Sequence, residues 1–256
     1  MSGGERALGV GTPSDVTARP PRAVEPPATV VRLAAGAPVD AVWRNKLGGT
    51  TFTWGQRFVK WHPGVREGFF ADEAARLRWA RAWTPVPRVV ELGSDDEGAW
   101  LVTERVDGCS AVDERWLAEP VTAVRAIGAG LRALHDALPV DGCPFDWGVP
   151  TRVARAHAHG IVVPEWLRDA PPTDRLVVCH GDACAPNTLV GEDGAWTAHV
   201  DLGSLGVADR WADLAAATWS TQWNYGAGFE DVLLEAYGVP PDPERLAYYR
   251  ALWDAT

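Results

Sequence analysis

Short apolar runs separated by turn residues fill the chain from about residue 31. Aromatic and β-branched residues dominate 41–44, 51–54 and 57–61, as a pleated sheet prefers. A helical period follows over 67–83, where Phe70, Ala74 and Leu77 recur at a spacing of three or four, and Pro85 ends it. The runs 88–92 and 99–104 flank a polar turn and predict a hairpin. This part of the chain is expected to form strands, one helix and two further strands.

After Gly108 the apolar pattern becomes helical. Along 121–138 apolar residues recur every three or four positions until Pro139, which predicts an amphipathic helix. Buried strands are expected at 176–179 and 197–200, and helices at 209–220, 227–237 and 242–253. We therefore predict an α/β (α+β) chain with a flexible, Pro-rich leader over 1–34, a nucleotide-binding lobe over 35–107, and a catalytic and substrate-binding lobe over 108–256.

Composition narrows the class of protein. With 256 residues, 46% of them apolar and 23% charged, the chain is expected to be globular with a sizeable core. Four Cys without a CxxC pair argue against a zinc cluster or a disulfide framework. The sequence has no run of 18 apolar residues and no signal-peptide pattern, so we expect no membrane span and a cytoplasmic location.

The net charge also bears on the partner. A formal charge of −10 disfavours nucleic acid and favours a polycationic small molecule, although solubility alone also accounts for such a charge. We expect no nucleic acid partner and a monomer.

Three motifs after the buried strands carry the chemistry. His180-Gly181-Asp182 leads to Asn187 five residues after the Asp, and Asp201-Leu202-Gly203 follows a short hairpin. This spacing is typical of phosphoryl transfer, in which a carboxylate on a fixed loop receives the proton of an attacking hydroxyl. Asn and Asp oxygens suit Mg²⁺. Taken singly, each motif is also compatible with an ordinary turn, a strand exit or a helix cap.

Lys60 lies in a predicted strand between bulky apolar residues. It is either a solvated lysine on an alternating strand or a fixed cation for nucleotide phosphates. The second interpretation needs a carboxylate partner, for which Glu73 on the following helix is placed, with Glu67 or Asp72 as alternatives. The turn at 45–51 would cover the phosphates with backbone N–H groups and the hydroxyl of Thr50 or Thr51.

These motifs and the run 206–215 resemble the aminoglycoside phosphotransferases, antibiotic-resistance kinases, over about residues 40–256. The resemblance is strongest to enzymes acting on a 3′ or 3″ hydroxyl. It implies a bilobal protein-kinase-like fold with a small antiparallel-sheet N-lobe and a mainly helical C-lobe. It also implies ATP and Mg²⁺ as cofactors and a cationic antibiotic as substrate.

The resemblance assigns roles residue by residue. Asp182 would be the catalytic base, Asn187 and Asp201 would bind Mg²⁺, and Lys60 with Glu73 would bind phosphate. The segment joining the lobes would offer the carbonyl of Glu104 and the N–H of Val106 to adenine, while His180 and Asp213 would brace the catalytic loop.

A cationic substrate implies an acidic cleft, for which Asp146, Glu165 and Asp254 are candidates. Asp141 is a further candidate, and all four could equally be surface carboxylates. Trp147 and Trp166 could stack on sugar rings or pack in the core.

Two positions depart from the family. Ser204 stands where many relatives have Arg after the Asp-x-Gly. The tail 252–256 holds one acid, Asp254, where 3′-selective relatives often carry adjacent acids. This tail favours the 3″ hydroxyl of a guanidinium-bearing substrate such as streptomycin over the kanamycin and neomycin group.

Other functions stay open at this point. A kinase of another small alcohol, such as a macrolide, choline or homoserine, would keep the same fold and would not need acidic substrate residues. A nucleotide-binding pseudoenzyme would bind ATP without turnover. A metallohydrolase using His180 and Asp182 would need a further cluster of metal ligands.

Overall fold

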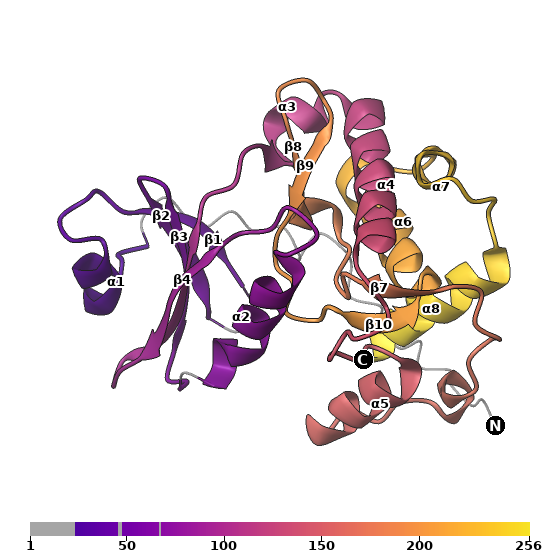
Figure 1. Cartoon of the computed structure of the whole chain (residues 1–256), viewed down its shortest axis with the longest axis horizontal. Coiled ribbons are helices and arrows are strands. Elements are labelled where there is room, and N and C mark those ends of the chain that lie inside the picture. The colour runs from indigo at the N-terminus through magenta and orange to yellow at the C-terminus, as the bar shows by residue number, and fades with distance from the viewer. Residues whose placement is uncertain (1–23, 46–47, 67) are drawn as a thin grey trace, which may run out of the picture.

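The computed structural model describes residues 24–45, 48–66 and 68–256, and it has two lobes (Figure 1). In the described residues of the first lobe, an antiparallel sheet has five strands in the order β1-β2-β3-β5-β4. Its strands are β1 (Asp40–Arg44), β2 (Thr50–Trp54), β3 (Arg57–Pro63), β4 (Val89–Ser94) and β5 (Gly98–Glu104). The strands and the hairpin predicted from the apolar pattern are confirmed.

Two helices flank this sheet on opposite faces (Figure 1). Successive side chains of a strand point to opposite faces. Lys60 of β3 therefore points toward α2 (Gly68–Ala80), where it meets Glu73, while Val59 points toward α1 (Ala28–Leu33). The helix predicted over 67–83 is confirmed as α2.

The position of α1 corrects the expected extent of the flexible leader. Val30 of α1 is fully buried with Phe52 and Val59 of the sheet, and Thr29 and Arg32 bond to Asp95 in the β4–β5 turn. Residues 28–33 are thus a docked helix rather than a loose segment, because they cover an apolar face of the sheet that would otherwise contact water. Residues 1–23 lie outside the described part of the chain.

The second lobe is mainly helical. The predicted amphipathic helix is α4, whose buried face includes Val124, Ile127, Leu131 and Leu134 and which packs against α7, while α6 packs against α8. The helices are α3 (Glu114–Leu117), α4 (Pro120–Ala137), α5 (Val149–Ala158), α6 (Trp211–Tyr225), α7 (Glu230–Tyr237) and α8 (Pro243–Ala255), with short 3-10 turns η2 (Glu165–Arg168) and η3 (Ala185–Asn187).

Short strands of the second lobe present the loops of the candidate site. One described sheet pairs β7 with β10, and another orders its three strands β6-β8-β9. Their bounds are β6 (Cys109–Ser110), β7 (Leu176–Cys179), β8 (Thr188–Val190), β9 (Trp196–His199) and β10 (Gly206–Asp209). The catalytic-loop motif follows β7 directly, and the Asp-x-Gly motif follows β9 after Val200.

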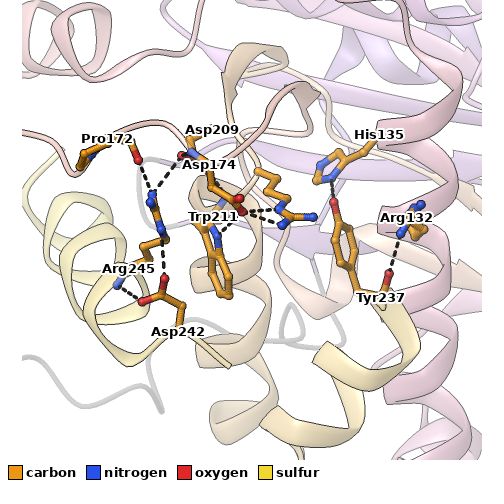
Figure 2. A network of polar contacts seen from close by, with 10 residues as sticks. Arg132, His135, Pro172, Asp174, Asp209, Trp211, Tyr237, Asp242 and Arg245 are labelled. Carbon is orange, nitrogen blue, oxygen red and sulfur yellow. Dashed lines mark hydrogen bonds and ion pairs between the residues drawn. The ribbon is translucent and has the colours of Figure 1, made fainter. Parts of the chain in front are cut away.

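A polar network fixes the start of α6 behind these loops (Figure 2). Arg245 of α8 donates to the carbonyl of Pro172 at 2.6 Å and pairs with Asp209 at the end of β10 at 3.4 Å. The indole N–H of Trp211 donates to Asp174 at 2.8 Å. Because these contacts join α8, β10 and the loop before β7, the first turn of α6 has a fixed position beside the catalytic loop.

No helix in the described ranges combines the length and apolar character needed to cross a bilayer.

Candidate active site

One amine joins the two lobes. Lys60 Nζ lies 2.7 Å from Glu73 Oε1 on α2 and 2.7 Å from Asp201 Oδ1 on the Asp-x-Gly turn. The sequence predicted the partner on α2, and Glu73 occupies that place. The solvated alternative for Lys60 is wrong, since both carboxylates hold its amine inside the junction.

Lys60, Glu73 and Asp201 shift one another's pKa values. Burial alone would lower the pKa of Lys60, but Asp201 and Glu73 outweigh burial and raise it above its ordinary value. Burial likewise would raise the pKa of Asp201, yet the ammonium of Lys60 lowers it. The pKa of Glu73 is raised, mainly by burial. At neutral pH, Lys60 is therefore a stable cation and Asp201 a stable anion.

The catalytic loop begins at a glycine that no other residue can replace without strain. Gly181 has φ of +85°, and a Cβ built there would lie 2.1 Å from the carbonyl oxygen of Ser204. The backbone of the catalytic loop consequently approaches the residue after Asp201-Leu202-Gly203 very closely. This contact brings the loop of Asp182 against the loop of Asp201.

Asp213, which is fully buried on α6, holds the start of the catalytic loop. It accepts hydrogen bonds from the N–H of His180 at 2.6 Å, the N–H of Gly181 at 2.9 Å and Nε2 of His135 at 3.0 Å. His135 in turn bonds through Nδ1 to the hydroxyl of Tyr237 at 2.8 Å (Figure 2). The bracing role predicted for Asp213 matches these contacts, whereas the support from His135 and Tyr237 was missed.

His180 uses both ring nitrogens on backbone groups. Its Nδ1 lies 3.3 Å from the N–H of Asp182, and its Nε2 lies 3.0 Å from the carbonyl of Val200. The first contact requires an acceptor and the second a donor, which assigns the tautomer protonated on Nε2. With both nitrogens engaged, His180 joins the two loops and is unsuited to binding the metal of a hydrolase.

Asp182 and Asn187 face each other across the catalytic loop. Asn187 Nδ2 donates to the backbone carbonyl of Asp182 at 2.9 Å and to its Oδ2 at 3.3 Å. The other carboxylate oxygen, Oδ1, is buried without a hydrogen-bond partner. Burial, followed by the nearby charge of Asp201, raises the pKa of Asp182. The loop thus holds a buried carboxylate oxygen whose hydrogen-bonding capacity is not used.

Asp201 adopts an unusual backbone conformation. Its φ of +64° is left-handed, a region that non-glycine residues seldom occupy but that Asp tolerates better than most. Such conformations concentrate at functional sites, where surrounding contacts hold them. Here the ion pair with Lys60 holds the side chain in the junction between the lobes.

A cavity of about 340 Å³ opens at this junction. Its lining unites residues predicted from distant parts of the sequence, namely Thr50, Thr51, Lys60, Glu73 and Asp201, with Ser204 at one side. Arg155 of α5 also lines it and was missed, because an exposed arginine on a short helix has no distinctive sequence pattern.

The remaining predicted residues lie elsewhere. Glu104 pairs through its side chain with Arg57 and Arg88 at the end of β5, and Val106 lines a separate hollow beside Pro85. Their proposed adenine contacts therefore remain a prediction.

Among the substrate candidates, Asp146 accepts hydrogen bonds from Gly148 and Thr151 at the start of α5. Glu165 on η2 and Asp254 near the end of α8 are exposed. None of the three lines the cavity around Lys60, so their substrate role also stays a prediction.

The sequence of this chain matches a known protein family. The family model described as "Phosphotransferase enzyme family" matches residues 29–159 and 150–249. The chain belongs to this family. The prediction of the family made from the three motifs is confirmed, and so is that of a bilobal α/β fold.

Relatives of this phosphotransferase are named for aminoglycosides. It is 40% identical over 211 residues to an aminoglycoside 3′-phosphotransferase of Streptomyces fradiae, covering 71% of this chain and 78% of that one. It is 36% identical over 227 residues to the streptomycin 3″-kinase of Streptomyces griseus, covering 75% and 82%.

A solved structure shows the same fold. The aminoglycoside phosphotransferase of Streptomyces rimosus, determined in complex with ADP and streptomycin, superposes with a TM-score of 0.68 at 26% identity, covering 89% of this chain and 97% of that one.

Proposed function

We propose that this phosphotransferase transfers the γ-phosphoryl group of ATP to a hydroxyl of an aminoglycoside, with the 3″ hydroxyl of streptomycin as the favoured acceptor. The observation that carries the proposal is the placement of Lys60 between Glu73 and Asp201, beside a catalytic loop whose Asp182 has a carboxylate oxygen without a hydrogen-bond partner. The relatives named above support the aminoglycoside as acceptor class.

The acceptor hydroxyl would bind to Asp182. Its Oδ1 is available for a hydrogen bond, and the raised pKa strengthens it as a proton acceptor relative to an ordinary aspartate. Asn187 holds Oδ2, so the carboxylate has a fixed orientation toward the incoming hydroxyl. Catalysis then depends on orientation and electrostatics rather than on a covalent enzyme intermediate.

The side chains of Asn187 and Asp201 offer oxygen atoms that suit a magnesium ion. The amide nitrogen of Asn187 makes both bonds to Asp182, which turns its oxygen the other way, and Asp201 supplies a carboxylate. These hard oxygen donors are the ligands that Mg²⁺ prefers, and the bound ion would neutralise charge on the nucleotide phosphates. Lys60 would bind the phosphates from the opposite side, in the cavity that Thr50 and Thr51 also line.

One observation favours a second candidate, the 3′ hydroxyl of kanamycin- or neomycin-type drugs. Identity to the Streptomyces fradiae 3′-phosphotransferase, 40%, exceeds the 36% identity to the streptomycin 3″-kinase.

An acceptor panel tests the proposal. Purified enzyme is incubated with ATP, Mg²⁺ and either streptomycin, kanamycin or hygromycin; ADP release is measured, and the new phosphate is located by NMR. We expect turnover of streptomycin with phosphate on the 3″ oxygen. Kanamycin turnover without streptomycin turnover would establish the second candidate, and ADP release with none of the three would refute the aminoglycoside assignment.

Asp182→Asn is the internal control of the panel. The substitution keeps the shape and removes the proton acceptor, so turnover should fall by about 1,000-fold or more. The matched variant Asp96→Asn, on the fully exposed β4–β5 turn, should leave turnover unchanged.

A further inference from the structure

Three tryptophans form a cluster outside the main core. Trp219 and Trp223 of α6 lie with ring centroids 5.0 Å apart, and Trp253 of α8 lies 6.0 Å from the first and 5.5 Å from the second. All three are half-buried, and none is among the described residues that form or pack against the large core. Below, Trp219, Trp223 and Trp253 are called the tryptophan platform.

The platform borders the catalytic loop. Ser220, which lies between Trp219 and Trp223 in the sequence, accepts a hydrogen bond from the N–H of Ala185 at 2.9 Å. Asn224 donates back to the Ser220 hydroxyl at 3.1 Å and fixes it. Residues three apart on a helix are neighbours, so the Trp223 side of α6 adjoins the loop that carries Asp182.

The end of α8, which carries Trp253, contacts α5. The hydroxyl of Thr256 accepts a hydrogen bond from Arg152 of α5 at 2.9 Å, and Arg155, one turn further along α5, lines the cavity with Asp201. Figure 1 shows the end of α8 near α5 and the junction of the lobes. The tryptophan platform is thus carried by two helices of the second lobe that contact the catalytic loop and α5.

The platform makes no cation–π contact within the described part of the chain. Among the described residues, none of the arginines that lie over an aromatic ring uses a ring of the platform. The nearest arginine in sequence, Arg250 on α8, pairs with Glu230 at 2.7 Å and donates to Thr218 at 2.9 Å. No arginine of the described residues therefore competes with a cation from solution for these partly exposed rings.

We propose that the tryptophan platform binds a guanidinium group of the acceptor and makes the enzyme selective for guanidinium-bearing aminoglycosides over those that carry only amines. The proposal rests on the proposed function and specifies its substrate class. A guanidinium is planar and weakly hydrated, so it stacks on an indole face at little cost in hydration. An ammonium is strongly hydrated and prefers carboxylates, and the three indole rings of the platform carry no charge.

Steady-state kinetics with single substitutions tests the platform. In Trp223→Leu and Trp253→Leu the apolar volume is largely kept and the π face is lost. Each should raise the KM for streptomycin by about tenfold or more, while the KM for ATP stays within about twofold. The Trp→Phe variants keep a ring and should recover most of the affinity. Trp83→Leu is the matched control, because Trp83 is also half-exposed and stacked on a tryptophan, Trp79, but lies in the first lobe.

Calorimetric titration of streptomycin separates this proposal from the proposed function. Turnover with KM values unchanged in both Leu variants would overturn the platform and leave the function standing. Binding to the wild-type enzyme that is lost in the Leu variants, without any turnover, would support the platform and overturn the function. Absence of binding by a folded wild-type enzyme would overturn both. Circular dichroism of each variant checks folding, and Trp219→Leu, at the third ring of the platform, replaces either Leu variant that does not fold.

Discussion

A single amine, Lys60 Nζ, joins a helix of the first lobe to the Asp-x-Gly turn of the second. Sequence alone could predict this residue, because a lysine among bulky apolar residues of a strand is unusual in a chain with only two lysines. The sequence could also propose Glu73 as the carboxylate partner of Lys60. It could not exclude Glu67 or Asp72, since the choice depends on the rotation of α2 about its axis. The contact with Asp201 joins residues so distant in sequence that only the folded chain shows it.

Replacing Lys60 by Met tests the amine directly. The variant keeps the length of the side chain and removes the cation, so kcat/KM for ATP should fall by about 100-fold. Steady-state kinetics with ATP as the varied substrate measures the effect. Arg78→Met, on the exposed side of α2, is the control and should change nothing. A Lys60→Met enzyme that uses ATP like the wild type would remove Lys60 from phosphate binding.

At the scale of elements, the long periodic segments were predictable and the short ones were not. α2, α4 and the β4–β5 hairpin follow from apolar spacing that extends over many residues. α1 was missed because it spans Ala28–Leu33, fewer than two turns, and its N-cap Pro27 offers no side-chain cap. Its stability comes from packing on the sheet, which a local pattern does not contain. β8 and β10, of three and four residues, were missed for the same reason.

Val30 and Val31 provide a matched pair for the docking of α1. Val30 is fully buried against the sheet and Val31 is 49% exposed. Val30→Ala should lower the free energy of unfolding by about 2 kcal/mol, because it removes buried methyl groups and leaves a cavity. Val31→Ala should cost less than about 0.5 kcal/mol. Urea denaturation of both variants measures the difference, and equal effects would contradict the docked position of α1.

A comparison of alanine substitutions at Gly181 and Gly142 distinguishes the effect of backbone strain from that of steric overlap. Both have φ near +86°, but a Cβ at Gly142 meets nothing within 4 Å, whereas at Gly181 it meets the carbonyl of Ser204. Gly142→Ala should cost about 1 kcal/mol from strain alone. Gly181→Ala should cost more and should also abolish turnover, because the catalytic loop must move. Thermal unfolding and an activity assay measure the two effects, and a fully active Gly181→Ala enzyme would contradict the close approach.

At the scale of the whole molecule, Asp213 connects four parts of the second lobe. It bonds to the catalytic loop and to His135 of α4, while His135 reaches Tyr237 of α7. Burial alone would raise the pKa of Asp213, but the hydrogen bonds that it accepts from His135 and from the N–H of Gly181 lower it below its ordinary value. The carboxylate therefore stabilises the fold when it is ionised.

The lowered pKa of Asp213 predicts that the fold loses stability in acid. A carboxyl with a lowered pKa in the folded state contributes its full stabilisation above its unfolded pKa of about 4 and loses it as the pH falls toward the folded value. Asp213→Asn should lower the free energy of unfolding at neutral pH by about 3 kcal/mol. It should also reduce the loss of stability between about pH 5 and pH 3 relative to the wild type. Asp231→Asn, exposed on α7, is the control, and parallel pH profiles of the wild type and Asp213→Asn would contradict this role.

The close approach of Gly181 to Ser204 has a consequence for how such an enzyme can diversify. Where two backbones touch, neither can shift alone, so mutations that move the loop of Asp182 also move the loop of Asp201. Natural variation that alters drug preference would then accumulate on the bordering surfaces of α5, α6 and α8, where side chains can be exchanged while the reacting atoms stay in place.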